Sequence, residues 1–222
     1  MTCFKDMEAI LFDFEGTLVD FQWNKSRAVR ETLEMLASSG FSTDRIQYRT
    51  YSTLMREATK TAPEIGWSPD HIRNKIDVIY DRYDEDALSR WTVRSKAKEF
   101  LHLLKTKNIR IGLVSNVGKG ALKKAFSRLK LEDFFGVIVS RNDVRTLKPS
   151  GEGIHLALRH LKIEKEKALF IGDSLDDIYA ARDAGVKVAI IAGGETPKDE
   201  ILSAGPDCLV RSFDELIGMI PT

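Results

Sequence analysis

From about residue 95 onward, short apolar runs alternate with amphipathic segments of helical period. A short apolar run bounded by turn residues is typical of a buried strand, and its alternation with helices predicts an α/β fold with a parallel sheet covered on both faces. The apolar run at residues 9–12 fits the same sheet. We expect strands at residues 9–12, 109–114, 137–139, 168–171, 186–191 and 208–210, and helices at residues 97–107, 119–130, 153–161 and 176–184, after Thr196-Pro197 and after Ser212.

Residues 18–94 have a different pattern. They are rich in charge, lack strand-like runs and carry helical periodicity, with one helix at residues 23–39 before Gly40 and another that opens at Ser68-Pro69. A chain of 222 residues is long enough for two domains. We therefore expect an α/β domain made of residues 1–17 and 95–222, interrupted by an all-helical insertion at residues 18–94.

The composition argues against several classes of function. Lys and Arg number 34 against 33 Asp and Glu, so net charge favours neither nucleic acid nor an anionic membrane as a partner. Cys3 and Cys208 lie at opposite ends of the chain without metal-ligand spacing, and we expect neither a disulfide framework nor a zinc site. The start lacks a signal peptide's apolar core and no run reaches membrane-spanning length, which favours a cytoplasmic protein. Nothing indicates an obligate protein partner.

Asp13 directly follows the apolar run at residues 9–12 and opens the segment Asp-Phe-Glu-Gly-Thr. In open α/β sheets ligands bind beyond the carboxyl ends of the strands, so this carboxylate is expected where chemistry takes place. A lone Asp-x-x-Gly also serves simply to end a strand and start a turn. Later segments of the chain decide between the two interpretations.

Two of these segments follow other expected strands. Ser115-Asn116 lies between a strand and a helix, an arrangement that can cradle an anion but also serves for plain helix capping. Lys148-Pro149 lies in the loop after the third strand, where Pro restrains the backbone. An ammonium held beside a carboxylate stabilises developing anions, whereas the simpler alternative is a solvated loop lysine.

Asp173, Asp176 and Asp177 lie close together where the fourth expected strand leads into a helix. Like charges at such spacing need a cation to offset their repulsion. Mg²⁺ suits them, because it takes few protein carboxylates and shares its remaining coordination with water and phosphate. Attraction to the helix N-terminus is the alternative, and it accounts for Asp176 and Asp177 but not for Asp173, which precedes the turn.

In order and spacing, these segments resemble the four motifs of the haloacid dehalogenase superfamily, at residues 13–17, 115–116, 148–149 and 172–177. The resemblance runs nearly end to end, because the helical insertion is similar to that family's first type of cap domain. It implies a Rossmann-like catalytic core with an inserted helical cap. It further implies a Mg²⁺-dependent phosphatase of a small phosphorylated metabolite, acting through an aspartyl-phosphate.

The resemblance also implies a role for individual residues. The catalytic residues would be Asp13 as nucleophile, Glu15 as acid and base, and Lys148. The substrate-binding residues would be Thr17, Ser115 and Asn116, to which we add the nearby cation Lys119. The Mg²⁺ ligands would be Asp13, the main-chain carbonyl of Glu15 and Asp173, with Asp177 acting through a water molecule.

Glu15 departs from the family pattern, in which phosphatases usually have Asp two residues after the nucleophile. Its extra methylene displaces the carboxylate, and small displacements of a catalytic group can cost much of the rate. Acid–base capability is retained, and the carboxylate lies one bond farther from the backbone. Metal binding should persist, because the position contributes its carbonyl oxygen.

Other functions share these motifs. A phosphomutase or phosphotransferase would use all four, a 2-haloacid dehalogenase would attack carbon without a metal, and a non-catalytic binding protein would need none of the chemistry. The metal-type carboxylates count against dehalogenation, as does Glu15, where dehalogenases characteristically carry Tyr. Substrate choice is expected to lie in the helical insertion, where the candidate selectors are Trp23, Arg27, Tyr48, Arg49 and Arg56.

Overall fold

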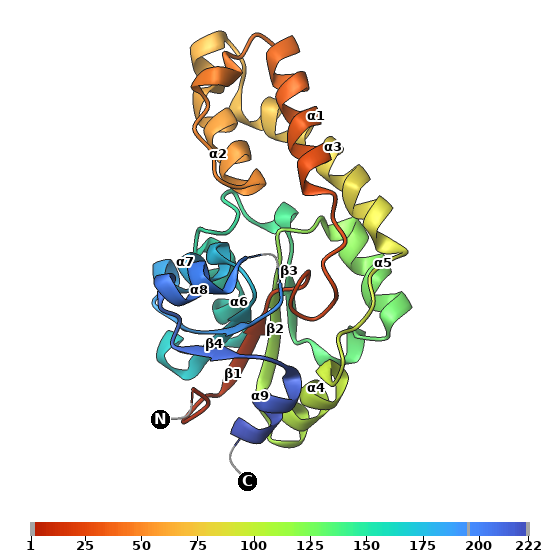
Figure 1. The fold of residues 1–222 in the computed structure, drawn as a ribbon, viewed down its shortest axis with the longest axis vertical. Helices are drawn as coiled ribbons and strands as arrows, with labels where there is room; N and C mark the ends of the chain where they lie inside the picture. The colour runs from red at the N-terminus through yellow and green to blue at the C-terminus, as the bar shows by residue number, and fades with distance from the viewer. Residues whose placement is uncertain (1–2, 195, 221–222) are drawn as a thin grey trace. The chain divides into compact units, whose positions relative to one another are not determined.

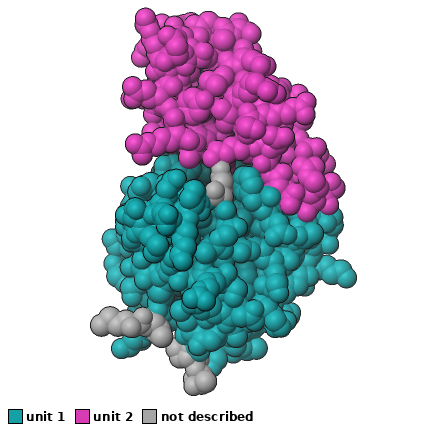
Figure 2. Space-filling model, viewed as in Figure 1, with its two compact units in different colours: residues 1–21, 91–222 teal, residues 22–90 magenta. Residues whose placement is uncertain are grey.

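The computed structural model describes residues 3–194 and 196–220. The chain divides into two compact units, coloured separately in Figure 2. The sheet unit comprises Met1–Phe21 and Trp91–Thr222, and the helical unit comprises Gln22–Arg90.

The helices and strands of the sheet unit lie within a few residues of their expected bounds. Its strands are β1 (Ala9–Phe12), β2 (Arg110–Val114), β3 (Val137–Val139), β4 (Ala168–Gly172), β5 (Lys187–Ile191) and β6 (Cys208–Val210). Its α-helices are α4 (Ala97–Thr106), α5 (Lys119–Leu129), α6 (Glu152–Leu161), α7 (Leu175–Ala184), α8 (Lys198–Ala204) and α9 (Phe213–Met219).

The expected parallel sheet is confirmed. Its strand order is β3-β2-β1-β4-β5-β6, and every neighbouring pair is parallel. β1 lies between β2 and β4, with Leu11 opposite Gly112 on one side and Phe170 on the other. The segments that follow these three strands therefore emerge together at the carboxyl edge of the sheet.

Helices lie on both faces of the sheet (Figure 1), and side chains that alternate along the strands pack against them. Leu11 packs with Ile154 of α6 and Ile178 of α7 on one face. Phe12 points to the other face, where its ring meets that of Phe100 in α4 at a centroid distance of 6.1 Å. β1 is buried along its whole length, which explains why its sequence is continuously apolar.

The α-helices of the helical unit are α1 (Lys25–Ser38), α2 (Tyr51–Thr61) and α3 (Pro69–Leu88). The sequence predicted α1 and α3 but gave no separate expectation for α2. As expected, the Ser68 side chain caps α3, accepting from the amide of His71, with Pro69 in the first turn. No helix in the described part of the chain is long and apolar enough to cross a membrane.

Two segments of the sheet unit, one on each side of the helical insertion, pair with one another. Val19 and Val93 form an antiparallel bridge, flanked by hydrogen bonds from the Asp20 amide to the Thr92 carbonyl at 3.1 Å and from the Arg94 amide to the Leu18 carbonyl at 2.9 Å. The chain therefore leaves and re-enters the sheet unit along neighbouring paths.

We expected no disulfide, and this expectation is wrong. Cys3 and Cys208 form a disulfide, with their Cα atoms 6.4 Å apart. Cys3 precedes β1 and Cys208 begins β6, so both lie at the amino edge of the parallel sheet. Their separation of 205 residues in sequence concealed a proximity that the strand order creates.

Candidate active site

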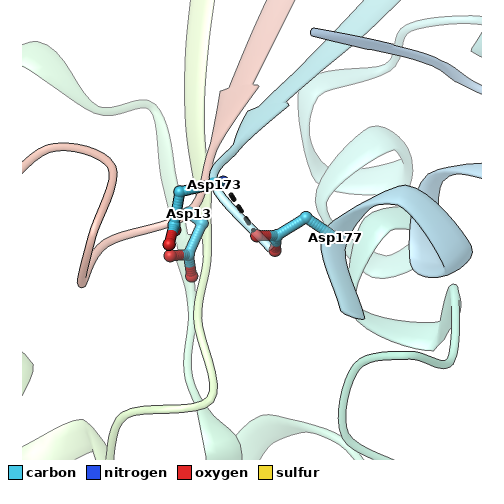
Figure 3. Close-up of side chains that lie close together, drawn as sticks. All are labelled: Asp13, Asp173 and Asp177. Atoms are coloured by element: carbon cyan, nitrogen blue, oxygen red, sulfur yellow. Dashed lines mark hydrogen bonds between the residues drawn. The ribbon is translucent and has the colours of Figure 1, made fainter. Parts of the chain in front are cut away.

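Three carboxylates meet at the carboxyl edge of the sheet (Figure 3). Asp13 follows β1, Asp173 follows the neighbouring β4, and Asp177 lies in the first turn of α7. The Asp13 amide donates to the Ile171 carbonyl at 2.9 Å, which continues the pairing of the two strands. One oxygen from each carboxylate lies within 4.8 Å of the other two, and all three residues are buried. The structure leaves Asp176 outside this group.

Lys148 supplies the positive charge at this group. Its Nζ atom lies 2.5 Å from Asp13 Oδ1 and 2.6 Å from Asp177 Oδ1, and its side chain is 5% exposed. The interpretation of Lys148 as a solvated loop lysine is therefore wrong. One ammonium among three carboxylates leaves negative charge that a divalent cation would balance.

The charges in this group act on one another strongly because water is excluded. Burial raises the pKa of Asp13 to about 6, since the opposing effect of the Lys148 ammonium is partly cancelled by the charge of Asp177. Burial alone would lower the pKa of Lys148, but the charges of Asp13 and Asp177 together raise it above its usual value. The lysine is therefore a fixed cation at neutral pH.

Asp177 connects the charged group to the start of α7. Its Oδ2 accepts from the main-chain amides of Asp173 and Ser174 and, at 2.7 Å, from the Ser174 hydroxyl. The Ser174 hydroxyl in turn accepts from the Asp177 amide, which completes a capping box. One oxygen of Asp177 thus fixes the turn, while the other faces Lys148.

Two glycines leave the space that Asp173 occupies. A Cβ atom at Gly16 would lie 2.4 Å from Asp173 Oδ2, and one at Gly194 would lie 2.1 Å from the same oxygen. Gly16 also has a φ of 87°, which favours glycine. The hydroxyl of Thr17, which we expected to bind substrate, donates to Asp173 Oδ1 at 3.0 Å and orients that carboxylate.

Of the other residues expected to bind phosphate, Asn116 contacts Lys148, Ser115 is buried nearby in sequence, and Lys119 points elsewhere. The Asn116 side chain donates to the Lys148 carbonyl at 3.2 Å and accepts from its amide at 3.1 Å. Ser115 is buried at the end of β2, and its hydroxyl accepts from the Val117 amide. Lys119 instead pairs with Asp143 at 3.0 Å, and its side chain is 71% exposed.

Sequence reasoning missed one residue that contacts the candidate acid and base. The indole Nε1 of Trp91 donates to Glu15 Oε1 at 2.8 Å. Trp91 is fully buried, although 76 residues separate it from Glu15 in sequence. No motif or spacing in the chain signals this pair.

The helical unit has a pocket of its own, with a volume of about 660 Å³. Its lining includes Trp23, Tyr48 and Arg49, three of the five residues suggested as substrate selectors. Arg27 and Arg56 are not part of that lining, and Arg56 pairs with Glu57. Trp23 is mainly a core residue, because its ring packs on Tyr51 with 4.6 Å between centroids.

Comparison with known proteins agrees with this geometry. The sequence model of the haloacid dehalogenase-like hydrolases matches residues 10–191. The chain belongs to this family. The family is one of hydrolases. The match extends across the insertion, and the buried group of Asp13, Lys148, Asp173 and Asp177 lies within the matched region.

Relatives of this family member include phosphatases. A phosphoglycolate phosphatase from Photorhabdus laumondii is 25% identical over 219 residues, covering 97% of this chain and 93% of the relative. Pyrophosphatase PpaX from Bacillus cereus is 26% identical over 227 residues, covering 96% of each chain. Among solved structures, a hydrolase from Pseudomonas syringae matches with a TM-score of 0.73 at 22% identity, covering 96% of this chain and 97% of that one, which shows the shared fold.

Proposed function

We propose that the protein is a Mg²⁺-dependent phosphatase that acts on a small phosphorylated metabolite through an aspartyl-phosphate on Asp13. The observation that carries the proposal is the buried group at the sheet edge, in which Lys148 and the carboxylates of Asp173 and Asp177 lie close to Asp13, the potential nucleophile. The phosphatase relatives support the same class of reaction.

The donor set fits a hard divalent cation, because it consists of carboxylate oxygens with too few positive charges to balance them. Asp13, Asp173 and the main-chain carbonyl of Glu15 would hold the ion, and Asp177 would contribute through a water molecule. When bound, the ion supplies positive charge against the carboxylates and the phosphoryl oxygens.

In the first half of the reaction, an Asp13 oxygen attacks phosphorus and the bond from phosphorus to the leaving oxygen breaks. The electron pair stays on that oxygen, which takes a proton from Glu15. In the second half, Glu15 removes a proton from water, whose oxygen binds phosphorus as the bond to Asp13 breaks. Orthophosphate leaves and Asp13 is restored. Lys148, Ser115 and the Asn116 amide hold the phosphoryl oxygens.

A screen of phosphorylated metabolites with Mg²⁺ or with EDTA tests the proposal, and phosphoglycolate and pyrophosphate come first because relatives are named for them. We expect phosphate release that stops in EDTA, returns with Mg²⁺ and falls by roughly a thousandfold or more in Asp13→Asn. Full activity in EDTA would reject the metal role. Halide release from a haloacid would indicate dehalogenation, and phosphoryl transfer without phosphate release would indicate a mutase or transferase.

A further inference from the structure

Trp91 contacts two neighbouring residues that follow β1, Phe14 and Glu15. The Trp91 ring is fully buried and meets the ring of Phe14 edge-on, with centroids 5.1 Å apart and planes at 86°. Phe14 lies between Asp13 and Glu15 in sequence. The indole therefore packs with its ring on the loop at residues 13–17, the nucleophile loop, and donates to Glu15 with its N–H group.

Main-chain hydrogen bonds fix the segment that carries the indole. Thr92 and Arg94 pair with residues on the far side of the Val19–Val93 bridge, directly after the nucleophile loop. The guanidinium of Arg128 in α5 donates to the Trp91 carbonyl. Trp91 is thus held by the sheet unit itself, and its N–H has a defined direction.

The length of Glu15 matches this N–H group. An Asp side chain is shorter by one carbon–carbon bond of about 1.5 Å. With the same backbone, that carboxylate would move from the observed 2.8 Å to beyond hydrogen-bond distance. The residue that departs from the family pattern is therefore the one whose extra methylene reaches Trp91.

The chemistry of the indole sets the direction of its hydrogen bond to Glu15. An indole N–H group donates and cannot accept. Its hydrogen bond to Oε1 therefore fixes that oxygen of Glu15 as an acceptor and holds the tip of the side chain.

We propose that Trp91 is a positioning residue for catalysis, which holds the Glu15 carboxylate in place through its hydrogen bond to Oε1. The inference rests on the proposed function of Glu15 as acid and base. It explains how the site accommodates Glu where the family usually has Asp: the longer side chain is anchored at its tip.

Trp91→Phe tests the proposal, because it keeps an aromatic ring against Phe14 and removes the N–H group. We expect kcat for a natural ester to fall about ten- to a hundredfold, the loss typical of one hydrogen bond to a charged group, with KM changed less than threefold. In the Glu15→Gln protein, whose acid–base group is already gone, adding Trp91→Phe should change kcat less than twofold.

Trp67→Phe is the matched control. It also removes one indole hydrogen bond, from Trp67 Nε1 to the Ser39 carbonyl at 3.0 Å in the helical unit. We expect its kcat to stay within twofold of the wild-type value. Wild-type kcat in Trp91→Phe, or an equal loss on adding Trp91→Phe to Glu15→Gln, would overturn the positioning role.

Glu15→Asp changes the other residue of this hydrogen bond. It tests the proposal without altering Trp91, and so serves if Trp91→Phe folds poorly. It withdraws the carboxylate from an intact Trp91, so kcat should fall to a similar extent, whereas an unchanged or faster rate would contradict the anchor. Unchanged turnover in Glu15→Gln alone would reject the proposed acid–base function instead, and this inference with it.

Discussion

Asp13 is subject to two opposed requirements. As the proposed nucleophile it must be ionised, yet burial raises its pKa to about 6 in spite of the adjacent Lys148 ammonium. Asp177 competes for the same ammonium, so the lysine cannot fully offset either charge. The site therefore holds the proposed nucleophile in an environment that disfavours its ionised form, and binding a cation would relieve that cost.

The stability of the metal-free protein should reveal this cost. The folded pKa of about 6 lies above the ordinary value of 3.8, so the folded state binds more protons between these values and loses stability as pH rises through them. We expect Asp13→Asn to raise the free energy of unfolding at pH 7 by about 1–3 kcal/mol and to have little effect near pH 4.

Urea unfolding in EDTA at the two pH values measures the difference. A loss of stability in Asp13→Asn at pH 7 would mean instead that the ion pair with Lys148 outweighs the cost of burial.

At the scale of elements, helix α7 joins folding and function, because Ser174 both caps the helix and holds the Asp177 side chain. Ser174→Ala should lower the free energy of unfolding by about 1 kcal/mol, as the loss of an N-cap does. It should also reduce kcat, because Asp177 faces Lys148 with its other oxygen.

Ser68→Ala is the control for this prediction, since Ser68 caps α3 in the helical unit with the same kind of bond. We expect a similar loss of stability, measured by urea unfolding, with kcat unchanged. Equal effects of both variants on kcat would show that the Ser174 cap has no particular link to catalysis.

The proximity of Asp13, Lys148 and Asp173 could be predicted from the sequence. Parallel strands bring their carboxyl ends to one edge of the sheet, so residues that follow different strands meet there however far apart they lie in sequence. Helix α2 was harder to predict, since its sequence contains several Thr residues of modest helix propensity and its capping box uses Thr50 with Thr53. The Glu15–Trp91 bond could not be predicted, because it depends on the path of the chain after the insertion.

At the scale of the whole molecule, the disulfide between Cys3 and Cys208 encloses most of the chain in one covalent loop. Closure of a loop of this length restricts the unfolded state, and the chain-entropy model gives an upper value of roughly 5 kcal/mol for the stabilisation. Urea unfolding with and without a reductant should show a lower midpoint after reduction. Cys3→Ser should match the reduced protein and be insensitive to reductant.

The same bond bears on the cellular location, which stays a prediction. Stable disulfides are uncommon in the cytoplasm of mesophiles, where thiols are kept reduced. Thiol labelling of the protein in freshly lysed cells distinguishes the two states. Two labelled cysteines would agree with the cytoplasmic expectation, whereas blocked cysteines would argue for an oxidising compartment.

The bridge between Val19 and Val93 has an evolutionary consequence. Residues facing each other across such a bridge have Cα atoms about 5 Å apart, a gap that a hairpin turn of two residues can close. The catalytic sheet therefore needs nothing from the intervening chain for its own connectivity. Residues 22–90 can therefore change in length or sequence while β1 stays between β2 and β4, which leaves the buried carboxylates and lysine in place.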